Sequence, residues 1–296
     1  MTQFMFKVLN KISLSQDLKR MDVLAPVIAR KAKPGQFVSV SPEEDDERIP
    51  LSIIEADPAR GSITLIFHEK GLTTKKLGAV AVNDEIFSIL GPLGIPSTIE
   101  KKGVVVCIAT GVGIPQILPI ARAFKKAGNN VIGIIGAKTK RALMVEPQFR
   151  LLCNKIFVTT NDGSYEKRGN ATDVLKQILD KQEVNQVYAI GSLDMMRAVC
   201  IMTAVKKIKT FVHLNPLMID CLGMCGSCRV KIAGREVLAC VEGPEFDGHE
   251  VDFEDFIIRM NVAEKEPLWN SQKLKPTPST KEDGAFKRFL SGILNK

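Results

Sequence analysis

The chain has 296 residues, enough for two or three compact units with buried cores. Hydrophobic residues make up 45% of the chain and charged residues 25%, a balance that excludes wholesale disorder. The formal charge is +8 (41 basic minus 33 acidic residues), but the basic residues are spread along the chain and only two Tyr and one Trp could stack on bases. This pattern disfavours a nucleic-acid role.

Residues 1–98 show period-two alternation and recurring turn residues, without a long helical period. Such short strands are most simply closed into an antiparallel β-barrel. The pattern predicts strands that include residues 36–40, 51–54 and 62–68.

Residues 99–208 change to buried strands that alternate with helices, which predicts a doubly wound parallel sheet. Strands are predicted at residues 104–108, 131–135, 155–160 and 186–190. Helices are predicted from residue 114, near residues 141–153, from near residue 172, and at 193–208.

Residues 209–260 carry four of the seven cysteines and short strands such as residues 229–232. Residues 261–296 read as a polar linker and a short terminal helix, which either packs on its own protein or docks on a partner. The expected fold class is therefore α+β multidomain: an antiparallel β-barrel, an α/β doubly wound nucleotide domain and a small C-terminal cluster domain.

No apolar run is long enough to span a bilayer, and no signal peptide is recognisable at the N-terminus. An odd number of cysteines without a secretory signal argues against a disulfide scaffold, so a cytoplasmic protein is expected. Cys107, Cys153 and Cys200 stand singly in apolar stretches and are expected to be small buried side chains.

The cysteines of residues 221–240 resemble an iron–sulfur site. Plant-type [2Fe–2S] sites use Cys, four residues, Cys, two residues, Cys, and then a distant Cys. Cys225, Cys228 and Cys240 follow this pattern, but Asp220 occupies the first position and Cys221 lies one residue too close. Spacing favours Asp220 as the fourth ligand, whereas the softness of thiolates favours Cys221.

A four-thiolate zinc site is the structural alternative for these cysteines, since it also uses Cys-x-x-Cys. Zinc sites more often pair two such units, and Cys240 stands alone, so the spacing favours the [2Fe–2S] cluster. A zinc-stabilised, non-catalytic binding protein is the corresponding non-enzyme alternative.

A nucleotide site is predicted at Thr110, Gly111 and Gly113, between a buried strand and a helix. Glycines there let a pyrophosphate approach the backbone amides at the helix N-terminus. The full Gly-x-Gly-x-x-Gly fingerprint is absent, and a glycine turn that serves tight packing is the alternative. A second turn, with Gly191 and Met195, follows the last predicted strand of this sheet and faces the same crevice.

The residues of the predicted nucleotide site are compatible with either NADH or NADPH. Lys138, Lys140 and Arg141 follow the second strand, where they could hold a ribose phosphate or form a solvated basic turn.

The order of these motifs resembles the ferredoxin–NADP reductase superfamily. The resemblance is carried by Pro34-Gly-Gln-Phe-Val38, Arg48-Ile-Pro-Leu-Ser52, Gly91-Pro-Leu-Gly94 and Gly111-Val-Gly113. Residues 215–220, 223–228 and 239–249 look like the small subunit of NADH-dependent ferredoxin:NADP oxidoreductase, also called the sulfide dehydrogenase small subunit. That group is close to the electron-transfer subunit of dihydroorotate dehydrogenase.

The resemblance implies that the barrel binds FAD, the second domain binds NAD(H), and the C-terminal domain holds a [2Fe–2S] cluster. In the nucleotide-bifurcating members one Asp and three Cys ligate the cluster, which implies Asp220, Cys225, Cys228 and Cys240 here. Dihydroorotate-type subunits use four Cys, and relatives usually carry Gly at the position of Cys221.

The resemblance also implies FAD contacts. They fall at Arg48, Pro50, Leu51, Ser52, the turn of Gly71, Thr73 and Thr74, and Gly91 and Gly94. His68 lies near the predicted flavin edge. Dihydroorotate-type subunits place an Arg directly before the Pro, where this chain has Ile49.

A nicotinamide gives up two electrons as a hydride, whereas an iron–sulfur cluster accepts them singly, so flavin is expected to lie between the two. No side chain need act as an acid or base, and His68, His213 and His249 are expected to have hydrogen-bonding roles. The chain has no substrate-oxidising domain, so the expected partner is a larger oxidoreductase subunit with flavin and iron–sulfur clusters. The alternatives are an electron-transfer subunit of dihydroorotate dehydrogenase and a stand-alone oxygenase-type reductase.

Overall fold

The computed structural model describes residues 6–265, with side chains to residue 261. The chain divides into a first compact unit up to Ile257 and a second from Ile258 onward. The first unit contains every strand of the described chain. The predicted terminal helix lies outside the described residues.

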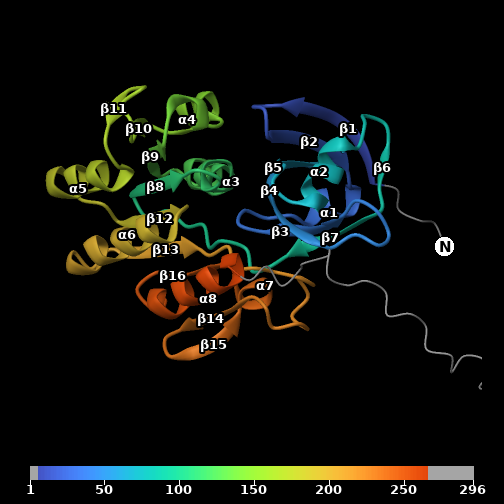
Figure 1. Ribbon diagram of the computed structural model, residues 1–296. Helices are drawn as coiled ribbons and strands as arrows, with labels where there is room; N and C mark the ends of the chain where they lie inside the picture. The colour runs from blue at the N-terminus through green and yellow to red at the C-terminus, as the bar shows by residue number, and fades with distance from the viewer. Residues whose placement is uncertain (1–5, 266–296) are drawn as a thin grey trace, which may run out of the picture. The chain divides into compact units, whose positions relative to one another are not determined.

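An antiparallel sheet of seven strands forms the N-terminal part of the first unit (Figure 1). Its order is β6-β1-β2-β5-β4-β3-β7, and β6 and β7 are separated along the chain only by Phe87. Since the two ends of the sheet are neighbours in the chain, the sheet turns back on itself around one apolar core, as the barrel prediction required. The strands are β1 (Phe6–Ser13), β2 (Leu18–Leu24), β3 (Phe37–Ser41), β4 (Ile49–Asp57), β5 (Ser62–His68), β6 (Glu85–Ile86) and β7 (Ser88–Leu93).

Two short helices interrupt this sheet, α1 (Pro26–Lys31) and α2 (Leu72–Ala79). The alternating pattern of residues 1–98 predicts only strands and turns here. Helices of six and eight residues contain about two turns, too few for a 3.6-residue period to stand out. The predicted turn at Gly71 is the start of α2, where the Thr74 hydroxyl accepts a hydrogen bond from the Gly71 N–H at 3.0 Å.

A second seven-stranded sheet follows, in the order β11-β10-β9-β8-β12-β13-β16, and all of its pairs are parallel except β13 with β16. The predicted doubly wound sheet is confirmed. Its strands are β8 (Val104–Thr110), β9 (Asn130–Ala137), β10 (Lys155–Thr160), β11 (Lys167–Arg168), β12 (Gln186–Ile190), β13 (Lys209–His213) and β16 (Glu245–Asp247). Its helices are α3 (Gly113–Lys126), a 3-10 turn η1 (Lys140–Ala142), α4 (Glu146–Leu152), α5 (Ala171–Lys181) and α6 (Leu193–Val205).

The strand order reverses between β8 and β12, which makes their carboxyl ends the topological switch point of the sheet. Helix α3 packs against these strands through its predicted apolar face, in which Ile114, Ile117 and Phe124 are fully buried. The two predicted nucleotide turns therefore lie at neighbouring strand ends.

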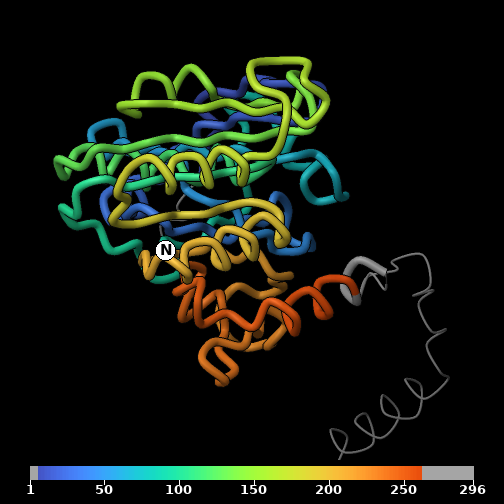
Figure 2. The backbone as a smooth tube through the Cα atoms, turned by 90° about the vertical axis from the view of Figure 1, so that its left-hand side faces the viewer, coloured from blue at the N-terminus to red at the C-terminus, as the bar shows by residue number. Residues whose placement is uncertain are grey.

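Strands β13 and β16 belong to the parallel sheet, although they lie within residues 209–260, which the sequence analysis set apart as a cluster domain. Between them the chain forms the cysteine loop, a hairpin of β14 (Arg229–Ile232) and β15 (Arg235–Leu238), and a four-residue helix α7 (Ala239–Glu242). Figure 2 follows this orange part of the chain. Helix α8 (Phe253–Lys265) comes next and extends into the predicted linker. The boundaries at residues 98, 208 and 260 stay predictions.

Candidate electron-transfer site

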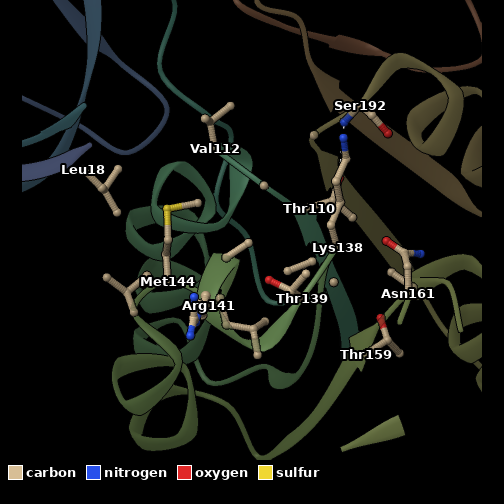
Figure 3. Close-up of a pocket in the computed structure, with 18 of the residues that line it drawn as sticks. Leu18, Thr110, Val112, Lys138, Thr139, Arg141, Met144, Thr159, Asn161 and Ser192 are labelled. Atoms are coloured by element: carbon tan, nitrogen blue, oxygen red, sulfur yellow. Dashed lines mark hydrogen bonds between the residues drawn. The ribbon is translucent and has the colours of Figure 1, made fainter. Parts of the chain in front are cut away.

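A cleft of about 1250 Å³ opens at the switch point of the parallel sheet. One side is formed by the ends of β8, β9, β10 and β12, and the other by residues 14–18 and the end of β5 in the barrel. Figure 3 shows Thr110, Lys138 and Ser192 along this lining, with Leu18 approaching from the barrel. The cleft is larger than most pockets for single drug-sized ligands and has room for an extended one.

The two predicted nucleotide turns are joined by a hydrogen bond. The backbone N–H of Ser192 donates to the Thr110 hydroxyl at 3.2 Å, and the Ser192 hydroxyl caps α6 by accepting from the Met195 N–H at 3.4 Å. Gly191 lies between them with φ +159°, and a Cβ atom there would lie 2.1 Å from the Thr110 hydroxyl. Thr110, Gly191 and Met195 all line the cleft.

Gly111 and Gly113 have different roles in this turn. Gly111 has φ +54°, lines the cleft, and a Cβ atom there would meet no described atom within 4 Å. Gly113 is buried, and a Cβ atom there would lie 2.3 Å from the carbonyl oxygen of Ile190. The space beside Gly111 suits the close approach of a ligand, whereas Gly113 serves the tight packing that the sequence analysis kept as the alternative.

The three basic residues after β9 lie in two different environments. Lys138 and Arg141 line the cleft, whereas the Lys140 ammonium lies over the Tyr165 ring, 4.7 Å from its centroid. Asn161 and Asn170 also line the cleft and are hydrogen-bonded to each other at 2.8 Å. Neither residue was among the predicted site residues, although a position after the third strand of a doubly wound sheet is a usable signal.

On the barrel side, His68 lines the same cleft as Thr110. Its Nδ1 lies 3.3 Å from an Asp17 carboxylate oxygen. A hydrogen bond from Ser15, and a smaller effect of His68, lower the pKa of Asp17. The sequence analysis missed residues 14–18, because a short polar turn carries no ligand-binding pattern of its own.

Most predicted flavin contacts lie outside this cleft, on and around β3. Leu51 pairs with Val38 in the β3–β4 ladder, and Ser52 pairs with Phe37. Gly91 of β7 lies on the other side of β3, where a Cβ atom would be 2.8 Å from the Val38 side chain. The predicted flavin segments of residues 48–52 and 91–94 thus lie on the two sides of β3. Pro50 is in β4, Gly94 follows β7, and Arg48 is exposed just before β4.

An ion pair links the remaining flavin segment to the loop before β4. Lys76 of α2 donates to Asp46 at 2.7 Å and to Glu43 at 2.6 Å, and these bonds raise the pKa of Lys76. The N-terminus of α2, with Gly71, Thr73 and Thr74, is thereby held toward the loop that leads to Arg48. Amides at a helix start suit the phosphates of a flavin dinucleotide, and a Cβ atom at Gly71 would lie 4.0 Å from the Thr74 hydroxyl, its nearest neighbour, so these residues fit FAD.

The cysteine loop is organised by Asp220. Its carboxylate oxygens accept hydrogen bonds from the backbone N–H groups of Leu222 at 2.9 Å, Met224 at 3.0 Å and Cys225 at 2.8 Å. Burial raises the pKa of Asp220, but these backbone donors outweigh it and hold the pKa below its usual value. The carboxylate is therefore ionised and directed into its own loop, toward the backbone of residues 222–225.

The three cysteines of the predicted ligand set differ in exposure. Cys225 is exposed, whereas Cys228 and Cys240 are buried and joined by a hydrogen bond of 3.5 Å from the Cys240 N–H to the Cys228 sulfur. Burial raises the pKa of Cys240 to about 12. At Cys225 hydrogen bonds from Ser227 outweigh the effect of burial and lower the pKa. The exposed Cys225 thiol is thus more ready to deprotonate than the Cys240 thiol.

Cys221, the rival ligand, occupies a different environment. It has φ +65°, a conformation that favours glycine, and its side chain is 1% exposed. Burial raises the pKa of its thiol to about 11. Cys240 is also buried, with a pKa raised further, so burial does not separate Cys221 from the predicted ligands. What separates Cys221 is its position one residue after Asp220, which holds the first place of the plant-type spacing.

Within the described part of the chain, no three His, Cys, Asp or Glu side chains are grouped around a single ion position. Asp220, Cys225 and Cys228 lie in one loop with Gly223 and Gly226 at positive φ, and Cys240 lies in α7, where its N–H donates to the Cys228 sulfur. One carboxylate and three thiols supply two ligands for each iron of a [2Fe–2S] cluster, so this donor set fits the cluster.

The other two histidines lie away from the cleft. His249 Nε2 is hydrogen-bonded to the Thr203 hydroxyl at 3.0 Å, as expected for a structural role. His213 is buried, and its Nδ1 has no hydrogen-bond partner among the described residues, so the hydrogen-bonding role expected for it is not found at this nitrogen. Burial lowers the pKa of His213 to about 4, which leaves the ring neutral.

Comparison with known proteins places these features in context. Residues 215–252 match the family model for the iron-sulfur cluster binding domain of dihydroorotate dehydrogenase B. The chain is 35% identical to a dihydroorotate dehydrogenase B (NAD(+)) electron transfer subunit homolog of Thermotoga maritima, over 91% of this chain and 95% of that protein. It is 30% identical to the electron transfer subunit of the Desulforamulus reducens enzyme, over 84% and 97% of the two chains.

Among solved structures, a chain of the NADH-dependent reduced ferredoxin-NADP oxidoreductase superposes with a TM-score of 0.83. It is 33% identical, and the match covers 96% of this chain and 98% of that one. The Amycolatopsis cytochrome P450 reductase GcoB has a TM-score of 0.56 at 19% identity, over 69% and 65% of the two chains, and shows a shared fold alone.

No helix in the described residues is long and apolar enough to cross a membrane. The barrel, the parallel sheet with its switch-point cleft and the cysteine loop follow one another along this chain. The matches to the Thermotoga maritima homolog and to the oxidoreductase chain cover almost the whole length of both proteins compared. The chain belongs to the family of dihydroorotate dehydrogenase B electron-transfer subunits and their homologues.

Proposed function

We propose that this chain passes electrons between NAD(H), FAD and one [2Fe–2S] cluster, to or from a larger oxidoreductase subunit of the ferredoxin:NADP oxidoreductase or sulfide dehydrogenase type. The observation that carries the proposal is the shared cleft, in which His68 of the barrel and the Thr110 and Gly191 turns of the parallel sheet line one space. A nicotinamide ring held on the sheet would thereby reach the barrel side.

The nucleotide would bind along the ends of β8 and β12. Gly111 offers open backbone for the pyrophosphate, and Thr110 and Ser192 hold the two turns in register. We propose Gly113 as a packing residue that positions α3 rather than a contact, while Lys138 and Arg141 lie near the ribose end.

The flavin would lie against the β3–β4–β7 part of the barrel. We propose that Pro50, Leu51 and Ser52 support the ring, and that the N-terminus of α2, with Gly91 of β7 and Gly94 just after it, holds the phosphates. Arg48 is exposed and free to reach a phosphate from the edge of β4. When bound, FAD exchanges a hydride with nicotinamide and single electrons with the cluster, while the chain supplies binding, orientation and exclusion of solvent.

For the cluster we propose Asp220, Cys225, Cys228 and Cys240 as ligands. Asp220 is ionised and Cys225 has a lowered pKa, as ligands must be deprotonated to bind. Cys221 is the poorer candidate, because it lies one residue past the first position of the plant-type spacing, which Asp220 occupies.

The larger partner subunit would bind over the exposed side of the cysteine loop. Apolar side chains are exposed around Cys225, and an exposed apolar patch of this kind is typical of a protein interface. They belong to Leu217, Ile219, Leu222, Met224 and Val241. The names of the relatives, which are electron transfer subunits, support a partner that carries the substrate chemistry.

A subunit of dihydroorotate dehydrogenase is the second candidate, favoured by the family model that matches residues 215–252. The two readings differ in the electron acceptor and not in this chain's cofactors. We also infer a reducing compartment such as the cytoplasm, since all seven cysteines are free thiols.

The test is to purify the chain anaerobically with its native partner and titrate it with NADH. Flavin bleaching at stoichiometric NADH, followed by the paramagnetic signal of a reduced [2Fe–2S] cluster, is the expected result. Supplying ferredoxin with NADP, and separately dihydroorotate, then separates the two partner types. Colourless protein containing zinc, or flavin that NADH does not reduce, contradicts the proposal.

A further inference from the structure

A carboxyl group that the proposed electron path does not use lies where three parts of the first unit meet. Glu245 of β16 is half-buried, and each of its carboxylate oxygens accepts a hydrogen bond from a hydroxyl group. Ser97 donates a short hydrogen bond to Oε2, and Tyr188 donates to Oε1 at 3.2 Å. Neither partner is a cation, so among the described residues this carboxyl group is hydrogen-bonded but has no counter-ion.

Backbone hydrogen bonds fix the segment around Glu245 to the chain that leaves the barrel. The Ile95 N–H donates to the carbonyl oxygen of Gly243 at 2.7 Å, and the Ser97 N–H donates to that of Pro34 at 2.9 Å. On the sheet side the Leu214 N–H donates to the carbonyl oxygen of Pro244 at 2.9 Å. Residues 243–245 are thus held between the barrel, the linker of residues 94–98 and the end of β13.

Close packing makes this junction sensitive to small displacements. A Cβ atom at Gly94 would lie 2.8 Å from both the Gly243 carbonyl oxygen and the Pro244 ring. Gly94 ends the predicted flavin segment of β7, and Gly243 follows the proposed cluster ligand Cys240 by three residues. A shift of Gly243 relative to Gly94 therefore moves the flavin side against the cluster side.

The surroundings of Glu245 determine the pH range in which its carboxyl group changes charge. Burial raises the pKa of Glu245 to about 7, although the hydrogen bonds from Ser97 and Tyr188 oppose this rise. Burial also raises the pKa of Tyr188, which stays neutral, and His213, directly opposite on β13, has a pKa lowered to about 4. Asp247, two residues along, is engaged by Lys209. Of these facing groups, Glu245 is the one that changes charge near neutral pH.

We propose that Glu245 is a positioning residue that clamps the segment after Cys240 to the linker leaving the flavin-binding barrel, and that protonation of its carboxyl group rearranges this clamp. With the carboxylate ionised, both hydroxyl groups donate to it. With the carboxyl protonated, the Tyr188 hydroxyl turns to the carbonyl oxygen of Thr98, which lies 3.4 Å away, and accepts from the acid. The consequence for electron transfer rests on the proposed function; the clamp itself does not.

The first arm of the test needs no electron acceptor. Thermal unfolding of the purified chain with its cofactors is measured between about pH 4.5 and about pH 8 for the wild type, Glu245→Gln and the exposed control Glu250→Gln. A carboxyl whose pKa is higher in the folded chain stabilises it most at low pH, and this contribution is lost as the pH rises toward 7. The unfolding temperature of the wild type should fall by several degrees relative to Glu245→Gln across this range. Equal pH profiles for the wild type and Glu245→Gln would overturn the clamp.

The second arm measures the rate at which the reduced-cluster signal appears after rapid mixing with NADH. The wild-type rate should change severalfold from about pH 6 to about pH 8, whereas the Glu245→Gln rate should stay at the low-pH wild-type value. Ser97→Ala, which removes a hydrogen bond that favours the ionised carboxylate, should move the change of rate to higher pH and serves if Glu245→Gln does not fold. Normal flavin reduction, with both variants keeping the wild-type dependence of the rate on pH, contradicts the clamp. Failure of NADH to reduce the wild-type flavin contradicts the proposed function instead, and the clamp is then tested by the unfolding measurements alone.

Discussion

The hydroxyl of Thr110 at the end of β8 accepts a 3.2 Å hydrogen bond from the backbone N–H of Ser192, just beyond the end of β12. These two strands are neighbours in the sheet but far apart in the chain, and the bond ties together the two turns that border the cleft. The nucleotide site is therefore a property of the pair of turns, and changes in either turn should have separable effects on binding and on stability.

The two glycines of the first turn provide such a separation. Gly113→Ala places a Cβ atom 2.3 Å from the Ile190 carbonyl oxygen and should destabilise the fold by about 1–3 kcal/mol. Gly111→Ala meets no described atom, so it should lower stability only by the cost of its positive φ, about 1–2 kcal/mol, while weakening NADH binding. Denaturant unfolding and NADH titration of both variants measure the two effects. The prediction is wrong if Gly111→Ala binds NADH as the wild type does.

Ligation of the cluster by Asp220 predicts unequal effects of two neighbouring substitutions. Asp220→Ala removes the carboxylate and three acceptor contacts for loop amides, so iron and acid-labile sulfide should both fall far below two per chain. Cys221→Ala removes a buried thiol and should leave both contents unchanged. Cluster loss in Cys221→Ala alone would instead identify the all-thiolate set.

The ion pair between Lys76 and Asp46 should control retention of FAD. Replacing Lys76 by Met keeps much of its length but leaves the Asp46 carboxylate, which is 8% exposed, without its cation. The loop before Arg48 and the start of α2 should then separate, and the dissociation constant for FAD should rise severalfold. Equilibrium dialysis with flavin fluorescence measures this change. The neighbouring exposed Lys75→Met is the matched control and should retain FAD.

The apolar side chains around the cysteine loop predict where the partner binds. Met224 is 85% exposed, and Met224→Lys should weaken association with the larger subunit by about tenfold, equivalent to about 1.4 kcal/mol. Leu151 on α4 is 86% exposed on a different part of the chain, and Leu151→Lys should leave association unchanged. Equal effects of the two substitutions would place the partner elsewhere. Iron content of each variant confirms that the loop still holds its cluster.

His213 should make the chain less stable in weak acid. Burial lowers its pKa from 6.5 to about 4 in the folded chain, so the unfolded chain takes up the proton first as the pH falls. This contribution is complete above pH 6.5 and is lost as the pH falls to 4, by about 3 kcal/mol in total. Denaturant unfolding at several pH values should show a shallower loss in His213→Leu.

The regular elements were predicted well where a single pattern is sufficient. Strands β5, β10 and β12 begin and end at the predicted residues, because continuous apolar or alternating runs between turn residues specify buried strands locally. The doubly wound sheet followed from the alternation of these strands with helices. Helices α1 and α2 were not predicted, because they are too short to show a helical period. Strand β13 was assigned to the cysteine region, because the order of elements along the chain does not show that it pairs with β12.

For the site, the sequence by itself determined the ligand types, the glycine turns and the order of the three parts, since these are local residue patterns. Only the tertiary structure decided that Gly111 borders the cleft while Gly113 packs against Ile190, that Lys140 stacks on Tyr165 beside two cleft-lining basic residues, and that Cys221 is buried while Asp220 is ionised. It also brought Glu245 to Ser97, 148 residues away. Such contacts and burial depend on which distant segments pack together, and no local pattern encodes that choice.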